Sequence, residues 1–236
     1  LVLYNGNGGD IMELIERNDY LDWLEKYRDK KVIKVITGLR RAGKSTIFDL
    51  YINRLIKSGV GVERIVKINF EELENETLRD RTVLYNYIMQ KYDSRDKLYV
   101  FLDEVQRVDG FEEAVDSLFV KEGVDLYITG SNAKFLSSEI ATLLTGRYVE
   151  INVLPLSFKE YYGHFGKGGK DKRELFMDYI TFGALPGIFM FDNGSAEQRE
   201  YTESVYKTVL EKDVLLRNSA ASKQLVENIL SYLVYN

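Results

Sequence analysis

The stretch that decides the fold of this chain is Gly38-Leu39-Arg40-Arg41-Ala42-Gly43-Lys44-Ser45. It matches the pattern G-x-x-x-x-G-K-S/T, which is typical of a phosphate-binding loop. Glycines let the backbone curl so that several N–H groups point at one place and form a concave anion site. A helix that follows the loop adds its positive N-terminal end. In such a loop Lys44 would reach the β- and γ-phosphates of a nucleotide, and the Ser45 hydroxyl would be an oxygen ligand for Mg²⁺.

The flanking sequence decides whether this match is meaningful, because the motif requires a strand before the loop and a helix after it. Residues 31–37 are apolar and β-branched and predict a strand. After the loop, apolar residues recur at helical spacing from Ile47 to Leu55, and Gly59 ends the run. Both conditions hold. The pattern therefore favours a phosphate-binding loop over a glycine turn beside an ordinary surface lysine.

Composition limits the remaining possibilities. The chain has 236 residues, of which 45% are hydrophobic, and this suits one large domain or one domain with a small companion. The net charge of −5 gives no general reason to expect nucleic-acid binding. The absence of cysteine excludes disulfides and thiolate metal sites, and a single histidine excludes a multi-histidine metal cluster. No apolar run approaches the ~18 residues of a membrane span, so we expect a cytoplasmic protein with no membrane segment.

A second motif supplies two carboxylates. Residues 98–102 form a continuous apolar run, as expected of a strand that is buried on both faces, and Asp103 and Glu104 follow it. Four apolar residues and an aspartate downstream of a phosphate-binding loop form a Walker B pattern. Asp103 would hold the Mg²⁺ shell, and Glu104 would orient and deprotonate the attacking water. The alternative is that both carboxylates cap the next helix.

Two further segments offer polar groups for the same site. Residues 125–129 predict a strand that runs into a polar turn, so Thr129, Ser131 and Asn132 are candidates to contact the γ-phosphate or the water. This requires that the strand lie between those of the two motifs, and turn chemistry alone could also place Ser and Asn there. The sequence also predicts a strand at 64–70 and a fifth strand at 148–153, which Arg147 precedes. Arg147 could reach a γ-phosphate in its own subunit or in a neighbour, or it could be a surface arginine.

The ends of the chain differ from this core. Residues 1–11 are rich in Asn and Gly, and we expect a disordered leader there, with Met12 as a candidate natural start. From Ser157 the chain becomes helical, and capping boxes are predicted at 157–160 and 195–198. The second of these opens a long predicted helix that ends near Arg217. The predicted organisation is a leader (1–11), a nucleotide-binding core (12–155) and a helical subdomain (156–236).

Taken together, the chain resembles the AAA-family P-loop ATPases of bacteria and archaea, the group described as AAA-family ATP-binding proteins. The segments that carry this resemblance are residues 38–46, 102–106, 129–131, 146–147, 154–158 and 211–217. The resemblance implies an α/β, three-layer αβα P-loop NTPase fold with a five-stranded parallel sheet in the order 5-1-4-3-2, followed by a small helical region. It also implies ATP and Mg²⁺ as cofactors, and Arg147 as an arginine finger or sensor.

Family members usually continue into winged-helix and nuclease-like C-terminal domains, and this chain stops where the winged helix would begin. Any contact with nucleic acid would therefore come through domains that are not in this sequence. The family resemblance defines the chemistry of the site better than it defines a cellular role.

We therefore predict an enzyme that binds ATP and hydrolyses it with Mg²⁺, with ATP and ADP as its ligands. The candidate catalytic residues are Lys44, Glu104, Arg147 and Asn132, and the candidate metal ligands are Ser45 and Asp103. The candidate nucleotide-binding residues are Gly38, Arg40, Arg41, Ala42, Gly43, Lys44, Ser45, Thr46 and Ser131. The alternatives are an ATP-binding switch with little turnover, a small-molecule kinase and a DNA-associated ATPase module. If Arg147 acts in trans, the protein must form a homo-oligomer.

Overall fold

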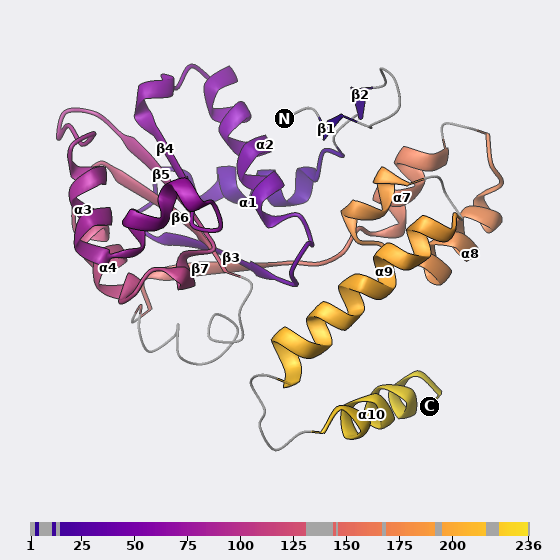
Figure 1. The fold of residues 1–236 in the computed structure, drawn as a ribbon. Coiled ribbons are helices and arrows are strands. Elements are labelled where there is room, and N and C mark those ends of the chain that lie inside the picture. Colours follow the sequence, from indigo (N-terminus) through magenta and orange to yellow (C-terminus); the bar gives the residue numbers. More distant parts are fainter. Residues whose placement is uncertain are drawn as a thin grey trace.

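A parallel sheet forms the centre of the structure (Figure 1). Its strands are β3 (Ile33–Gly38), β4 (Ile65–Asn69), β5 (Leu98–Asp103), β6 (Val124–Thr129) and β7 (Tyr148–Val153), in the order β4-β5-β6-β3-β7. Counted along the chain from β3, this order reads 2-3-4-1-5 from one edge and 5-1-4-3-2 from the other. The predicted fold class and strand order are therefore confirmed. The computed structural model describes residues 3–4, 11–12, 15–130, 144, 146–166, 169–191, 195–215 and 222–235.

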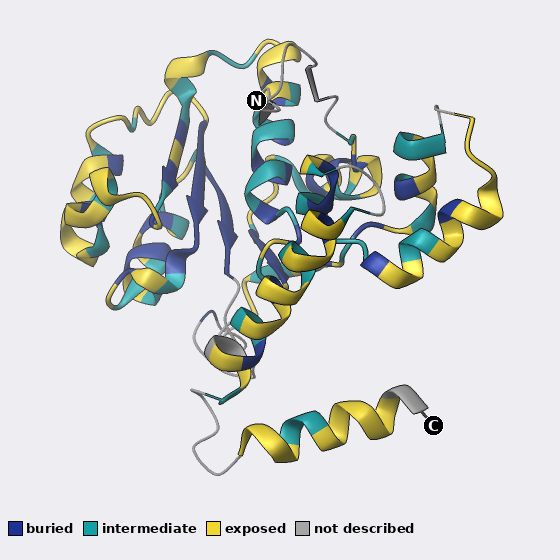
Figure 2. Cartoon of the chain, turned by 45° about the vertical axis from the view of Figure 1, so that its right-hand side comes forward, coloured by how far each residue is buried: buried dark blue, intermediate teal, exposed yellow. Residues whose placement is uncertain are grey.

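The central strands are buried on both faces because successive side chains of a strand point to opposite sides of the sheet. On β5, Val100 and Leu102 enter one apolar cluster, whereas Tyr99 and Phe101 enter the other. The dark strands enclosed by helices in Figure 2 show this double burial. Continuous apolar runs in the sequence thus correspond to strands covered on both sides.

Helices cover the two faces and complete the three layers. One face carries α1 (Asn18–Tyr27) and α2 (Lys44–Lys57), and the other carries α3 (Arg81–Met89) and α4 (Phe111–Phe119). The first pair buries Leu21, Leu24, Ile47, Phe48, Tyr51 and Leu55, and the second pair buries Leu84, Ile88, Ala114, Val115 and Leu118. Each set recurs at helical spacing, so each helix presents one apolar stripe to the sheet.

Short 3₁₀ helices join these elements, and the sequence did not predict them. They are η1 (Val62–Arg64), η2 (Leu73–Arg79) and η3 (Val105–Arg107). At the N-terminus, β1 (Leu3–Tyr4) pairs with β2 (Ile11–Met12) as a two-stranded antiparallel sheet, where the sequence predicts a disordered leader.

A helical region follows β7. Its elements are α7 (Phe158–Phe165), α8 (Lys172–Phe182), η5 (Pro186–Met190), α9 (Ala196–Val209), a π-helical segment η6 (Leu210–Leu215) and α10 (Lys223–Tyr235). Leu156, Tyr161, Leu175, Ile188 and Phe189 form a separate core between α7, α8 and η5. This region is aromatic-rich and packs around Tyr161, which is fully buried.

The helix starts in this region follow the predicted capping signals. Ser157 and Glu160 form the complete capping box at the start of α7. At the start of α9, the Ser195 hydroxyl accepts a hydrogen bond from the Gln198 N–H at 3.1 Å, which is one half of the predicted box. The long helix predicted to reach Arg217 changes to π geometry after Val209, and Arg217 lies outside the described residues.

The last helix, α10, keeps an apolar stripe on its surface. Leu225, Ile229, Leu230, Tyr232 and Leu233 are all among its exposed large side chains, and Figure 2 shows the helix largely in the colour of exposed residues. No helix in the described part of the chain is both long enough and apolar enough to cross a lipid bilayer.

The buried position of Leu126 gives a test of this core. Leu126 in β6 is 2% exposed, whereas Leu73 in η2 is 73% exposed. We predict that Leu126→Ala lowers the free energy of unfolding by about 2–5 kcal/mol, because it removes apolar burial and leaves a cavity. The matched Leu73→Ala exchange should change it by less than about 0.5 kcal/mol. Urea denaturation of both variants measures the difference, and equal losses would contradict this description of the core.

Candidate nucleotide-binding site

The chemistry-bearing residues meet at one edge of the sheet. In a parallel sheet the carboxyl ends of all strands lie at the same edge, which is where ligands bind in α/β folds. The strand register places Gly38 beside Val153 on one side of β3, and it places Asn69 beside Asp103 between β4 and β5. The loop after β3 and the carboxylates after β5 therefore lie on the same edge, with only β6 between their strands.

The loop between β3 and α2, which we call the P-loop (residues 38–45), has the curled backbone that its glycines predict. Gly38 has a φ of 139° and Gly43 a φ of 96°, and both values lie in the region that favours glycine. At Gly38 a side chain would also overlap the Val153 carbonyl oxygen. Arg41, with a φ of 66°, takes the left-handed conformation without being glycine. Gly43 is the N-cap of α2, so the loop ends at the positive end of that helix.

Lys44 folds back onto the loop and is 4% exposed. Its Nζ donates hydrogen bonds to the carbonyl oxygens of Gly38 and Leu39, both at 3.2 Å, and lies 3.5 Å from Glu104 Oε1. Burial lowers the pKa of the Lys44 ammonium, and the charges of Glu104 and Asp103 oppose this only in part. Lys44 is thus a buried cation held between the P-loop and the second motif.

Thr129 connects the two carboxylate residues. Its hydroxyl donates to Asp103 Oδ1 and accepts a hydrogen bond from the Glu104 N–H at 2.9 Å. The sequence offered Thr129 as a residue that could contact phosphate or water. The structure instead uses its hydroxyl to hold the backbone and carboxylate of the Walker B pair.

The Asp103 carboxylate has the features of a ligand for a hard cation. Burial raises the pKa of this carboxyl, and the hydroxyls of Ser45 and Thr129 oppose the rise in part. Asp103 Oδ2 is buried and has no hydrogen-bond partner among the described residues. An orphaned buried carboxylate oxygen beside a serine hydroxyl fits the oxygen ligands that Mg²⁺ takes alongside substrate phosphates. The predicted pair of Ser45 and Asp103 is therefore compatible with this metal.

The Glu104 carboxylate is oriented by its neighbours. Its Oε2 accepts a hydrogen bond from Gln106 Nε2 at 2.6 Å, and its Oε1 faces Lys44. Its backbone takes a φ of 55°, an unusual value for glutamate. Neither η3, which begins after Glu104, nor α4, which begins after Gly110, has a side-chain cap. The alternative that the two carboxylates cap the next helix is therefore wrong.

The other P-loop side chains point to neighbouring elements. Arg40 Nη1 lies 3.4 Å from Glu71 Oε1, beyond the end of β4. The Arg41 guanidinium lies over the ring of Tyr201 in α9, with its Cζ 5.6 Å from the ring centre. Ala42 is fully buried. Ser45 and Thr46 lie in the first turn of α2. In this conformation the two arginine side chains contact residues outside the loop, and their assignment to nucleotide binding remains a prediction.

Arg147 lies at the other edge of the sheet. It precedes Tyr148, which pairs with Ile33 at the start of β3, about 20 Å from the P-loop at ~3.3 Å per strand residue. Its Nη1 is 3.6 Å from Asp116 Oδ1, and the side chain is 46% exposed. A role for Arg147 in its own subunit is therefore wrong for this conformation. A residue just before a parallel strand lies at the edge of the sheet that the amino ends of the strands form, away from the phosphate site.

Two of the predicted site residues, Ser131 and Asn132, lie outside the described residues. Their proposed contacts with phosphate or water remain predictions.

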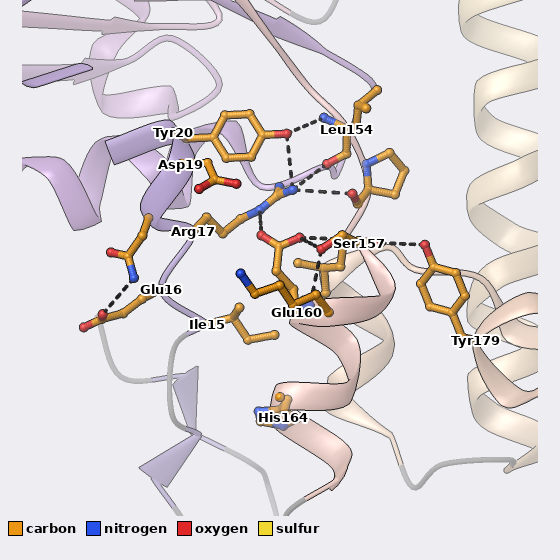
Figure 3. Close-up of a pocket in the computed structure, with 15 residues that line it drawn as sticks. Ile15, Glu16, Arg17, Asp19, Tyr20, Leu154, Ser157, Glu160, His164 and Tyr179 are labelled. Carbon is orange, nitrogen blue, oxygen red and sulfur yellow. Dashed lines mark hydrogen bonds and ion pairs between the residues drawn. The ribbon is translucent and has the colours of Figure 1, made fainter. Parts of the chain in front are cut away.

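A cavity of about 840 Å³ lies beside Arg17, and none of the described P-loop residues lines it. It lies between the segment before α1 and the start of the helical region, and Figure 3 shows Tyr20, Leu154, Glu160 and His164 around it. Arg17 lines the cavity and also donates a hydrogen bond to the Ala42 carbonyl at 3.0 Å. The sequence reasoning missed this cavity and Arg17, because no local motif marks residues that are brought together from three distant segments.

The geometry defines a class: the strand order, the loop at the end of β3 and the carboxylates at the end of β5 form a P-loop NTPase fold, which binds nucleotides. The chain belongs to the AAA domain family, whose pattern it matches over residues 30–162. The family thus covers the sheet, the P-loop and the start of α7.

Curated relatives extend the match beyond this domain. The chain is 34% identical to an uncharacterized protein of Haemophilus influenzae, over 94% of this chain and 56% of that protein. It is 33% identical to an uncharacterized protein of Methanocaldococcus jannaschii, over 86% of this chain and 47% of that protein. The chain therefore spans about half the length of the curated relatives it matches.

Solved structures share the fold. A Walker-type ATPase of Pyrococcus abyssi has a TM-score of 0.54 at 17% identity, covering 94% of this chain and 76% of that one. Hsp104 in a closed state with ATPγS and FITC casein also has a TM-score of 0.54, at 13% identity, covering 85% of this chain and 40% of that one. At these identities the likeness shows the fold alone.

Burial of Asp103 leads to a pH-dependent prediction. The pKa of this carboxyl in the folded protein lies above its ordinary value of 3.8. The protonated carboxyl therefore contributes to the stability of the folded protein below pH 3.8, and this contribution is lost as the pH rises through the raised pKa. Asp103→Asn cannot ionise and avoids this loss. Without nucleotide or Mg²⁺, its melting temperature should exceed that of the wild type by about 2–4 °C at pH 8, and by less at about pH 4, close to the ordinary pKa of 3.8.

Thermal unfolding in EDTA at both pH values measures the effect. Asp109→Asn is the matched control, since Asp109 is exposed, and it should not shift the melting temperature. A gain for Asp103→Asn that does not grow with pH would contradict the assignment of the penalty to the ionised carboxylate.

Proposed function

We propose that this protein binds ATP and hydrolyses it in a Mg²⁺-dependent reaction. The observation that carries the proposal is the meeting of Lys44, Asp103 and Glu104 at the carboxyl edge of the sheet, in three different environments. Lys44 is a buried cation on the P-loop, and Glu104 is oriented by Gln106. Asp103 keeps a buried oxygen that has no hydrogen-bond partner within the described part of the chain. These are the groups that phosphoryl transfer needs for charge neutralisation and for positioning the nucleophile.

Binding would use the P-loop for the phosphates, and the cavity lined by Arg17 is a candidate site for the rest of the nucleotide. The N–H groups of the curled loop and the start of α2 provide the anion site. The cavity has a volume of about 840 Å³, within the range of roughly 300–1,000 Å³ that is typical of small-molecule sites. Arg17 lines the cavity and donates a hydrogen bond to the Ala42 carbonyl, so this side chain links the cavity to the P-loop.

Ser45 and Asp103 would hold the Mg²⁺, which supplies positive charge against the phosphates when bound. Lys44 would exchange its contact with Glu104 for the β- and γ-phosphates. With Lys44 on the phosphates and Gln106 still on Oε2, Glu104 Oε1 would orient a water and accept its proton. Thr129 would keep both carboxylate residues in place through the two hydrogen bonds that it makes.

A nucleotide-dependent switch with little turnover is the second candidate. The contacts of Glu104 with Lys44 and Gln106 favour it, because a base that is engaged by two neighbours is not available to water. The chain spans about half of its curated relatives, so coupling of nucleotide state to further segments belongs to the proposal as well.

Substitution of Glu104 separates the two candidates. We predict that Glu104→Gln binds Mg·ATP as tightly as the wild type within about threefold but releases phosphate roughly 10²–10⁴ times more slowly, because it loses the general base. Phosphate release and nucleotide affinity measure the two effects, and Glu74→Gln, on an exposed residue of η2, is the control. Tight binding without turnover in the wild type would favour the switch.

Substitution of Lys44 tests the nucleotide site itself. Lys44→Ala should abolish measurable binding or turnover, because the loop loses its buried cation. Lys57→Ala, on an exposed residue at the end of the same helix, should behave as the wild type. Normal activity in Lys44→Ala would end the proposal.

Arg147 enters the proposal only as a residue that acts on a neighbouring subunit, because it lies at the edge of the sheet opposite the P-loop. In this arrangement an Arg147→Ala subunit keeps an intact Glu104, and a Glu104→Gln subunit keeps an intact Arg147. Each variant should be inactive alone, and their mixture should regain a substantial part of the wild-type phosphate release. Full activity of Arg147→Ala alone, or a mixture no better than its parts, would exclude the role in trans.

A further inference from the structure

Arg17 contacts three segments that are distant in the sequence, although its neighbours Glu16 and Asn18 are exposed. It precedes α1, is 5% exposed and has a guanidinium that faces three segments. Its Nη1 donates to the Ala42 carbonyl at 3.0 Å. Its Nη2 donates to the Leu154 carbonyl and its Nε to Glu160 Oε1, both at 2.9 Å (Figure 3). One side chain thus joins the P-loop, the chain just after β7 and helix α7.

The contact with Ala42 acts on the phosphate side of the loop. In a trans peptide the C=O of one residue and the N–H of the next point in opposite directions, and no described peptide bond is cis. When Arg17 holds the Ala42 carbonyl, it therefore also directs the Gly43 N–H away from itself. Gly43 is the N-cap of α2, and N–H groups at this place form the anion site of a P-loop.

The contact with Glu160 ends on a rigid carboxylate. Glu160 Oε2 accepts hydrogen bonds from the Ser157 N–H at 2.7 Å and from the Ser157 hydroxyl at 2.8 Å, while Oε1 accepts from Arg17. Burial alone would raise the pKa of the Glu160 carboxyl, but the hydrogen bonds from Ser157 and Arg17 outweigh it and lower this pKa. The ion pair therefore ties Arg17 to the first turn of α7 and not to a free surface group.

The helical region also reaches the P-loop from a second direction. Tyr201 of α9 lies under the Arg41 guanidinium, and a Cβ atom on Gly43 would lie 3.5 Å from Pro186 of η5. Movement of the helical region would therefore change the surroundings of the P-loop at both Arg41 and Gly43.

We propose that Arg17 is a positioning residue that sets the phosphate-facing peptide between Ala42 and Gly43 and couples it to α7 through Glu160. The inference rests on the proposed binding of nucleotide in the P-loop. Such coupling is reciprocal: phosphate in the loop favours the arrangement in which Arg17 spans Ala42 and Glu160, and displacement of α7 weakens phosphate binding.

The test uses Arg17→Lys, which keeps the charge but cannot make the forked contacts of a guanidinium. We measure the affinity for Mg·ATP and for inorganic tripolyphosphate with Mg²⁺. Both should weaken about tenfold. Tripolyphosphate has no base or ribose, so its loss reports the P-loop and not the cavity. The matched control is Arg79→Lys, since Arg79 also donates to a backbone carbonyl, that of Phe70, and its affinities should equal those of the wild type.

Glu160→Gln tests the coupling from the other side. It keeps the size and a hydrogen-bond acceptor but removes the charge, and it should weaken both ligands by a smaller factor than Arg17→Lys. Circular dichroism establishes that each variant is folded, and if Arg17→Lys is not, the Glu160→Gln result decides alone.

The outcomes are distinct. Wild-type affinity for both ligands in the folded variants would overturn the inference, and so would a loss for ATP with unchanged tripolyphosphate binding, which would assign Arg17 to the cavity only. A wild type that binds neither ligand would overturn the proposed function, and the inference with it.

Discussion

The arrangement of the site depends on keeping three charged groups out of water in one place. Lys44, Asp103 and Glu104 are all buried, and a buried charge is costly unless it is paired or hydrogen-bonded. Lys44 meets Glu104, and Asp103 meets the Thr129 hydroxyl. The second contact exists only because β6 lies beside β5. Strand order, loop curvature and side-chain pairing thus together keep these buried charges paired or hydrogen-bonded. Among the described residues, Asp103 Oδ2 is an atom of this group that has no hydrogen-bond partner.

The parts of this design that the sequence predicts are those with local signals. The strands follow from short apolar, β-branched runs, and their observed bounds lie within one or two residues of the predicted ones. The P-loop and the carboxylate pair follow from motifs whose spacing reflects contact with phosphate. The strand order is different, because it came from family resemblance and not from any pattern within the strands. The capping box at Ser157 is a further local signal, and it marks the start of α7 correctly.

The parts that the sequence does not predict depend on contacts between distant residues. Arg17 and Glu160 are separated by 143 positions, and neither belongs to a motif that announces the other. Thr129 could be recognised as near the site, but its role required the position of Asp103 in three dimensions. η2 has no apolar periodicity, so its acidic sequence reads equally well as a turn. Arg147 is a case in which reasoning from chemistry alone ignored the direction of the strand that follows it.

The first glycine of the P-loop has a consequence beyond nucleotide binding. A side chain at Gly38 would collide with the backbone of Val153, so this glycine is required by the neighbouring strand as well as by the curl of the loop. The conformation of the loop therefore depends on the position of the end of β7. A protein engineer who transplants this loop into another parallel sheet would have to carry the adjoining edge strand with it, even though that strand contributes no group to the chemistry.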